Sequence, residues 1–478
     1  MLFNSADFAL FLPIVFLLYW FVTPKNRQKQ NGLLLISSYF FYSCWDYRFL
    51  FLLLFSTVLD YYTGIKMYES KTITRKKCWF WLSISINLGF LGVFKYYNFF
   101  ATSFAEMLAQ LGLKIDVWTL QIILPVGISF YTFHGLSYVI DIYKSRIKPC
   151  KNFVEYALFV AFFPLLVAGP IERATHLLPQ IQKSRQFDYL KAVDGLRQIL
   201  WGLFKKIVIA DNCAHYANLI FNHSADYSGS TLVVGALFFT FQIYGDFSGY
   251  SDIALGTARL FGIELLRNFA FPYFSRDIAE FWRRWHISLS SWFRDYLYVP
   301  LGGSKGGLGM KIRNTFIIFL VSGFWHGANW TFIAWGALNA LYFLPLLVLN
   351  KNRNHLEIVA HGKRYPSVKD VFNILFTFIL TVFAWIFFRA DSLSHAFSYI
   401  ATIFSASLLS VPQMLPIPII GLVCLFLCVE WLGREEQYAL ANVGSSLAPP
   451  LRWAIYYGLI GAILYFGGEE QQFIYFQF

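Results

Sequence analysis

The chain alternates long apolar runs with short polar segments from its first residues onward. A helix of about 20 apolar residues crosses the hydrocarbon core of a bilayer, so runs of this length predict membrane spans. The first candidate spans are residues 7–23, 32–43, 47–65, 78–98 and 120–142. Later candidates are less regular, and several are too short or too polar for a simple crossing: 153–170, 196–211, 231–247, 314–324, 328–349, 370–388, 396–410, 413–432 and 451–467. We predict an all-α polytopic membrane protein of about 11–12 transmembrane helices, with re-entrant and amphipathic helices around a central cavity.

Basic residues gather in the polar segments after the first, third and fifth candidate spans. The clusters are Lys25, Arg27 and Lys29; Lys66, Lys71, Arg75, Lys76 and Lys77; and Lys144, Arg146, Lys148 and Lys151. Because cytoplasmic loops carry an excess of Lys and Arg, this pattern predicts an extracytoplasmic N-terminus. Arg434 and Arg452 border a later loop in the same way, which predicts an extracytoplasmic tail at 468–478. We also expect an interfacial amphipathic helix at 99–118 and a cytoplasmic loop at 350–369.

Composition excludes a soluble protein. Only 14% of the 478 residues are charged, against about 25% in ordinary soluble domains, while 57% are hydrophobic and 20% aromatic. The net charge of +12 does not point to nucleic acid, because the basic residues follow the loops between spans. The six cysteines show no zinc spacing, so we expect no metal site. We interpret 1–478 as a single integral-membrane domain without a separate soluble domain.

The segment 281–300, FWRRWHISLSSWFRDYLYVP, is too polar for lipid contact, and its apolar residues recur at helical spacing. The opposite face of this predicted helix carries Arg283, Arg284, His286, Ser290, Arg294 and Asp295. Two interpretations are open. The helix is either an interfacial amphipathic helix with solvated charges, or it borders an aqueous entrance where the arginines face an anionic donor and His286 faces the cavity.

The segment 319–335, FLVSGFWHGANWTFIAW, places His326 in an apolar, aromatic run. Ionisable residues are costly inside a membrane and are therefore functional candidates, although a lone His is often a hydrogen-bonded core residue. Gly323 and Gly327 would allow a substrate or another backbone to approach the imidazole closely. A neutral His can accept a proton from an attacking hydroxyl, so His326 is a candidate general base.

A third polar cluster, QIYGDFSGYSD at 242–252, contains Asp246 and Ser248. Either residue could simply begin a helix that continues through Ile253 to Phe261, since Asp and Ser are favoured N-caps. Alternatively, the carboxylate has a functional role in the apolar interior. The chain has no GxSxG motif, no phosphate-binding loop and no dinucleotide-binding fingerprint.

The segments MLFNS, QIYGDFSGYSDIALG, FWRRWHISLSSWFRDYLYVPLGGS and SGFWHGANWTFIAWG resemble, in order and spacing, the AlgI-like branch of the membrane-bound O-acyltransferase superfamily. The resemblance covers essentially the whole chain and implies an acyltransferase built around a tunnel through the membrane. It implies that His326 is the essential catalytic residue at the tunnel centre and that His286 is the second histidine, on the cytoplasmic side. The substrate- or donor-binding residues that we expect are Arg283, Arg284, Arg294, Asp295, Trp325, Asn329 and Asp246.

The same resemblance implies a bacterial inner-membrane enzyme of polysaccharide O-acetylation, with no bound cofactor. Its acyl donor would be a cytoplasmic thioester, acetyl-CoA or an acyl carrier protein, and its final acceptor an extracytoplasmic polysaccharide, alginate-like in the first place. An extracytoplasmic SGNH-type acetyltransferase would be the partner. Related proteins, PatA and DltB, serve peptidoglycan and teichoic acids, which remain alternative acceptors.

The C-terminal sequence FIYFQF resembles the Phe-x-Tyr motif of DltX, the small partner of DltB, which implies that Tyr475 accepts the acyl group and passes it on. An extended tail from Gly467 to Phe478 reaches about 36 Å at ~3.3 Å per residue, more than half of a hydrocarbon core of about 30 Å. Tyr475 could instead belong to an interfacial aromatic belt. Two other classes remain open, a channel or transporter in which His326 is a gate or proton site, and a structural scaffold for polysaccharide secretion.

Overall fold

The computed structural model describes residues 1–24, 26–113, 115–121, 123–167, 169–443, 447–468 and 471–474. All regular elements in these ranges are helical, which confirms the predicted all-α class. Helices long and apolar enough to cross a membrane are Tyr47–Glu69, Ile73–Gln110, Gly229–Leu260, Trp330–Val348 and Val368–Arg389. The chain is therefore a multi-pass membrane protein, and the predicted total of about 11–12 crossings stays a prediction.

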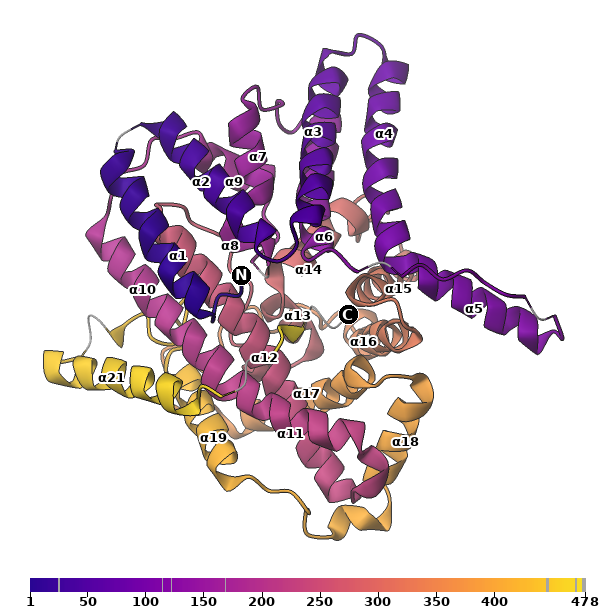
Figure 1. Cartoon of the computed structure of the whole chain (residues 1–478). Coiled ribbons are helices and arrows are strands. Elements are labelled where there is room, and N and C mark those ends of the chain that lie inside the picture. Colours follow the sequence, from indigo (N-terminus) through magenta and orange to yellow (C-terminus); the bar gives the residue numbers. More distant parts are fainter. Residues whose placement is uncertain are drawn as a thin grey trace. The chain divides into compact units, whose positions relative to one another are not determined.

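The chain divides into two compact units, residues 1–189 with 258–265, and residues 190–257 with 266–478. The helices of the first unit are α1 (Ala6–Leu17), η1 (Leu18–Val22), α2 (Arg27–Ser43), α3 (Tyr47–Glu69), α4 (Ile73–Leu91), η2 (Gly92–Tyr96), α5 (Tyr97–Gln110), α6 (Ile128–Tyr143), α7 (Phe153–Ala161), α8 (Phe163–Leu166) and α9 (Ala174–Ile181). Helices α3 and α4 lie side by side (Figure 1), and both pack against α6.

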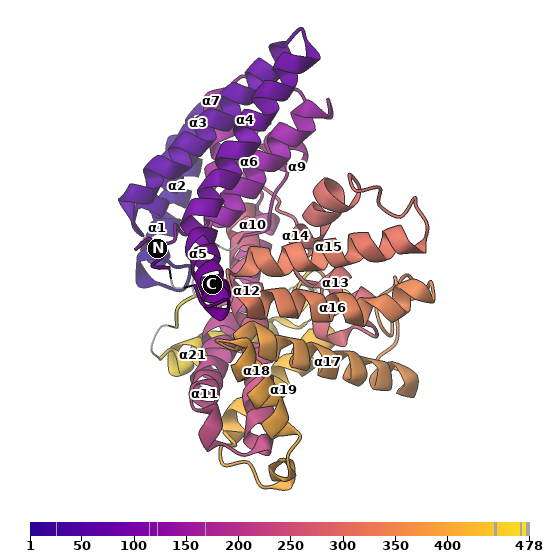
Figure 2. The ribbon, with the colours of Figure 1, turned by 90° about the vertical axis from the view of Figure 1, so that its right-hand side faces the viewer.

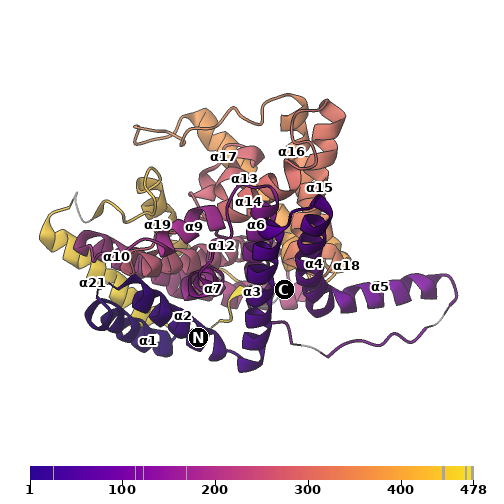
Figure 3. The same ribbon diagram turned by 90° about the horizontal axis from the view of Figure 1, so that it is seen from above.

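Two sequence expectations for the first unit are refined. The interfacial helix expected at 99–118 ends at Gln110, and Figure 3 shows this helix, α5, extending away from α4. The candidate span 153–170 is broken between α7 and α8 at Phe162, whose ψ of 113° is not helical. Pro164 lies two residues further on, in the first turn of α8, and its ring and missing N–H disfavour a continuous helix through this position.

Two of the three predicted cytoplasmic segments of the first unit meet at one cavity of about 700 Å³. Its basic lining residues come from the first and the third basic clusters: Arg27, Arg146, Lys148 and Lys151. Arg27 pairs with the buried Glu155 at 3.3 Å, and Arg146 pairs with Asp141 at 3.0 Å. Two loops that the charge pattern assigns to one side of the membrane therefore lie together.

The second unit contains α10 (Tyr189–Leu203), η3 (Phe204–Ala210), α11 (Asp211–Asn222), η4 (Ser224–Asp226), α12 (Gly229–Leu260), η5 (Pro272–Phe274), α13 (Ile278–Arg284), α14 (Ile287–Phe293), η6 (Arg294–Tyr298), α15 (Leu308–His326), α16 (Trp330–Val348), α17 (Val368–Arg389), α18 (Leu393–Ile403), η7 (Ala406–Leu409), α19 (Ile417–Leu432) and α21 (Pro449–Phe466). Tyr189 at the start of α10 and Ala258–Leu260 at the end of α12 belong to the first unit. Figure 2 shows α15, α16 and α17 layered one beside the next.

Helix α12 is the buried axis of the second unit, with 83% of its most apolar window inside the structure. Its glycines allow α10 to approach at backbone distance. A Cβ on Gly256 would lie 2.4 Å from the carbonyl oxygen of Gly195, and one on Gly249 would lie 2.8 Å from that of Gly202. Small residues permit this kind of close helix crossing in membranes. The expectation that Asp246 or Ser248 begins a helix is wrong, because both lie inside the continuous α12.

Candidate active site

His326 is the last residue of α15, at the turn into α16. The two helices cross in backbone contact, because a Cβ on Gly323 would lie 2.2 Å from the carbonyl oxygen of Phe332 and one on Gly336 would lie 2.3 Å from that of Phe319. A Cβ on Gly327 would lie 2.1 Å from the Phe332 ring. Of the two roles considered for the small neighbours of His326, the structure shows the approach of another backbone. The Asn329 side chain caps α16 by accepting from the Thr331 amide at 3.0 Å.

Aromatic rings enclose the His326 imidazole, which is 4% exposed. The ring centroids of Trp325, Trp335 and Phe388 lie 4.9, 5.1 and 5.5 Å from that of His326. Trp335 in turn stacks on Trp385 at 5.7 Å. These rings come from α15, α16 and α17, so the layering of the three helices builds the enclosure. An aromatic wall excludes water and strengthens electrostatic interactions inside it.

One hydrogen bond defines the tautomer of a neutral His326. Its Nδ1 lies 2.6 Å from the carbonyl oxygen of Ser322. A carbonyl oxygen only accepts, so Nδ1 carries the proton and donates. In the neutral imidazole Nε2 is then the basic nitrogen, which is the arrangement that a general base needs.

His286 lies beside His326, and their ring centroids are 6.4 Å apart. His286 is 1% exposed, and the Phe247 ring of α12 meets it edge-on at 4.6 Å. Its backbone is in the left-handed region, with φ of 42°, which is uncommon for a residue with a side chain. Strained backbone of this kind is frequent at functional sites.

The expectation of one amphipathic helix over 281–300 is wrong, because the helix breaks at His286 into α13 and α14 and continues as η6. The cause is tertiary hydrogen bonding on both sides of the break. The Ala270 amide donates to the Arg284 carbonyl at 3.0 Å, and the Ile287 amide donates to the Asn268 carbonyl at 2.9 Å. These bonds replace the helical pattern and turn His286 into the interior.

The expected donor-binding arginines have protein partners. Arg283 donates to the carbonyls of Asn352 and His355 at 2.9 and 2.7 Å, and Arg284 pairs with Glu280 at 2.8 Å. Arg294 pairs with Asp295 at 2.7 Å on the surface, with 62% of the Arg294 side chain exposed. The structure thus brings Trp325 and His286 to His326, while Arg283, Arg284, Arg294 and Asp295 form contacts elsewhere in this unit. Their roles in donor binding stay predictions.

Asp246 is 2% exposed and faces η3, where Lys206 is 1% exposed. The Lys206 Nζ lies 2.8 Å from Asp246 Oδ1 and 2.7 Å from Asp211 Oδ1. The last described residues of the chain join this pair. The Ile474 amide donates to Asp246 Oδ2 at 2.7 Å, and Lys206 donates to the Gln471 carbonyl at 3.0 Å. Tyr475 lies outside the described residues.

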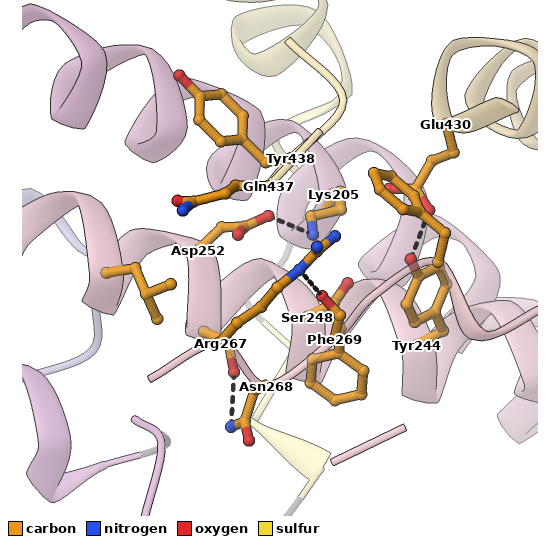
Figure 4. A pocket seen from close by; sticks show the side chains of 13 residues that line it. Lys205, Tyr244, Ser248, Asp252, Arg267, Asn268, Phe269, Glu430, Gln437 and Tyr438 are labelled. Carbon is orange, nitrogen blue, oxygen red and sulfur yellow. Dashed lines mark hydrogen bonds and ion pairs between the residues drawn. The ribbon is translucent and has the colours of Figure 1, made fainter. Parts of the chain in front are cut away.

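A second polar cluster uses α12 residues on both sides of Asp246 (Figure 4). Lys205 pairs with Asp252 at 2.5 Å, and the Tyr244 hydroxyl donates to the Glu430 carboxylate of α19. These side chains line a cavity of about 20 Å³, enough for a water molecule but not for an acyl donor. The cluster joins η3, α12 and α19.

Three residues that contact predicted site residues were not predicted from the sequence: Lys206, Glu280 and Ser322. The two lysines in the apolar run WGLFKKIVIA were a usable signal, because charges inside a membrane are rare and normally paired. Glu280 is 1% exposed and binds both Arg276 and Arg284, but its segment reads as an ordinary helix start. The Ser322 contact uses a backbone carbonyl, so no sequence signal could indicate it. Within the described residues no group of three or more His, Cys, Asp and Glu could hold a metal ion.

Comparisons with known proteins identify the family of the chain. The model of the membrane-bound O-acyltransferase family matches residues 143–388, which include both histidines. A Pseudomonas putida protein described as a probable alginate O-acetylase, AlgI, is 37% identical over 456 residues, covering 94% of this chain and 90% of that protein. A Helicobacter pylori peptidoglycan O-acetyltransferase is 37% identical over 83% of this chain and 78% of its own length.

A more distant relative is a Bacillus subtilis teichoic acid D-alanyltransferase, 28% identical over 45% of this chain and 57% of that protein. The family match covers about half of the chain, and the two closer relatives extend the similarity over most of the rest. The chain therefore belongs to the membrane-bound O-acyltransferase family and is an acyltransferase.

Proposed function

We propose that this enzyme moves an acetyl group from a cytoplasmic thioester across the membrane for O-acetylation of an extracytoplasmic, alginate-like polysaccharide. The observation that carries the proposal is the His326 imidazole, whose Nδ1 is held by the Ser322 carbonyl inside an aromatic enclosure. This arrangement supports a neutral His326 with Nε2 as the base. The 37% identity to a probable alginate O-acetylase supports the acetyl group and the acceptor class.

In the first step, the phenolic oxygen of Tyr475 attacks the carbonyl carbon of the donor thioester. A C–O bond forms and the C–S bond breaks. His326 Nε2 takes the phenolic proton and returns it to the departing thiolate, so the imidazole ends the step neutral. The acetyl group is then an aryl ester on the tail, and the free thiol remains in the cytoplasm. His286 is the second imidazole on the donor side of the path.

In the second step, a hydroxyl of the acceptor attacks this ester, and Tyr475 regains its proton. An extracytoplasmic SGNH-type transferase is the proposed partner that passes the group to the sugar. The donor is acetyl-CoA or an acyl carrier protein, and the membrane is the bacterial inner membrane with both termini outside. The meeting of two basic clusters at one cavity of the first unit supports a common, cytoplasmic side for those loops.

Peptidoglycan is the second candidate acceptor. The Helicobacter pylori relative is named as a peptidoglycan O-acetyltransferase, and its 37% identity equals that of the Pseudomonas putida alginate relative, although it covers less of this chain, 83% against 94%. Mass spectrometry of the cell envelope and of secreted polysaccharide, with and without this gene, distinguishes the two. If cells without the gene lose acetate from muramic acid and keep it on secreted polysaccharide, the acceptor is peptidoglycan and not an alginate-like polysaccharide.

The catalytic proposal is tested by His326→Ala in membranes supplied with acetyl-CoA or an acetylated carrier protein. We expect loss of acetyl transfer at unchanged membrane abundance. His361→Ala is the matched control, because His361 is an exposed loop residue paired with Glu435 at 3.4 Å. Full transfer by His326→Ala would overturn the general-base role.

A further inference from the structure

Lys206 and Asp246 form an ion pair that is buried inside the second unit, and removing two charges from water costs free energy. Lys206 lies in η3 and Asp246 in the middle of α12, and neither side chain has more than 3% of its surface exposed. Two charges taken out of water are not compensated by their mutual attraction alone, and further hydrogen bonds are needed to satisfy their remaining atoms. The partners that complete this site indicate its role.

Those partners are backbone groups of the C-terminal tail. The Lys206 ammonium is surrounded by oxygens of Asp211, Asp246 and the Gln471 carbonyl, at 2.7, 2.8 and 3.0 Å. The carboxylate of Asp246 uses one oxygen for Lys206 and the other for the Ile474 amide at 2.7 Å. The cation thus binds a carbonyl at the start of residues 471–474, and the anion binds an amide at their end.

The side chains of the tail are buried at the same place. Phe473 is 0% exposed and Ile474 1% exposed. The Phe473 ring lies 4.4 Å from the Tyr250 ring and 6.2 Å from the Phe247 ring, both on α12. Phe247 also contacts the His286 ring at 4.6 Å. One aromatic ring therefore separates the anchored tail from the histidine pair.

We propose that Lys206 and Asp246 form a receptor for the chain's own tail, residues 471–474, and that this receptor positions the following residue for reaction at His326. The positioning part of this inference rests on the proposed function, whereas the docking of the tail does not. Asp246 is then a positioning residue that holds the acyl-accepting segment, and it is not a ligand of the donor. The two charge-assisted hydrogen bonds hold the backbone of the tail. Its register is set by the buried Phe473 side chain against Tyr250, because backbone groups recur along any chain.

The test is hydrogen exchange of the C-terminal peptide in the full-length protein in lipid nanodiscs. Lys206→Met, Asp211→Asn and Asp246→Leu together remove the buried charges without leaving a carboxylate that has lost its cation. Proteins often tolerate the replacement of a complete buried ion pair by uncharged side chains without loss of stability. Asp246→Asn is a second, nearly isosteric variant. Asp252→Asn is the matched control, because it removes the same charge from the same helix but its partners are Lys205 and Gln198.

We expect exchange at residues 471–474 to become about tenfold faster or more in both receptor variants, since a charge-assisted hydrogen bond is lost. Exchange in the α12 peptides should stay slow, which a general loosening of the fold would not allow. The control should exchange at the wild-type rate. Unchanged exchange of the tail in the receptor variants would overturn the proposal, and so would equal acceleration in the control.

The acetylation state of the tail, measured on the same samples, separates the two proposals. If the tail exchanges fast in the receptor variants but never carries acetyl in wild type, the receptor proposal holds and the relay proposal is wrong. If the wild-type tail carries acetyl, and the receptor variants show the same exchange and the same acetylation as wild type, the relay proposal holds and the receptor proposal is wrong.

Discussion

The imidazole rings of His286 and His326 lie 6.4 Å apart inside one aromatic enclosure. Neither ring comes from a regular mid-helix position, since His326 ends α15 and His286 separates α13 from α14. Helix ends allow two side chains to converge where packed helices would hold their backbones apart. The pair explains why two distant motifs in the sequence serve one site.

Replacement of His326 by Ala should reduce acetyl transfer by about 10²- to 10⁴-fold, the usual contribution of a positioned general base. The measurement is the initial rate of acetyl transfer from the donor in nanodiscs, normalised to folded protein. His361→Ala should keep the wild-type rate. A His326→Ala rate within twofold of wild type would contradict the role of the Nε2 atom.

Tyr475→Phe should abolish transfer of acetyl to the extracytoplasmic acceptor without lowering thermal stability, because the change removes only a hydroxyl. The measurement is acetate content of the product polysaccharide in cells that carry each variant. Tyr465→Phe makes the same change on an exposed residue of α21, 82% exposed, and should leave the product acetylated. An active Tyr475→Phe enzyme would remove the relay step and leave direct transfer to the acceptor.

Gly323→Ala should destabilise the second unit by about 1–3 kcal/mol, because the new methyl group overlaps the Phe332 carbonyl. It should also reduce activity, since the α15–α16 crossing places His326 against Trp335. Gly309→Ala lies in the same helix with nothing within 4 Å of its Cβ, and it should be neutral or slightly stabilising. Thermal unfolding in detergent followed by aromatic fluorescence measures both. Equal stability of the two variants would contradict the close crossing.

Glu280→Gln should lower stability by about 3 kcal/mol, because it leaves Arg276 and Arg284 without their buried carboxylate. Asp295→Asn breaks an ion pair whose Arg294 side chain is 62% exposed, and such pairs contribute about 0–1 kcal/mol. Chemical unfolding of the two variants against wild type gives the comparison. A Glu280→Gln protein as stable as Asp295→Asn would show that the arginines find other partners.

The sequence was sufficient to predict the helical class and the long spans, because these depend on the length of apolar runs. It also indicated His326 as a residue of interest, because ionisable residues are rare in membranes, and its role as a base stays a prediction. The sequence was insufficient at 281–300. The apolar spacing runs through His286 without interruption, whereas the break is caused by backbone hydrogen bonds from 268–270. Periodicity cannot report a tertiary contact of this kind.

The environment of Asp246 also depends on tertiary contacts that local sequence does not indicate. Local sequence favoured a helix cap, since Asp and Ser precede an apolar run. The structure instead continues α12 through this position and satisfies the carboxylate with Lys206, which lies outside the cluster that the sequence singled out. Only the fold brings the η3 lysine and the C-terminal tail to the same carboxylate.

The acyl relay through Tyr475 is tested most directly by mass spectrometry of the C-terminal peptide from protein purified with its acetyl donor, in wild type and in His326→Ala. We predict an acetyl group on Tyr475 in wild type and none in the His326→Ala variant. An acetyl-free tail in donor-loaded wild-type protein that still transfers acetate would contradict the relay, and an acetylated Tyr475 in His326→Ala would contradict the role of the histidine as base.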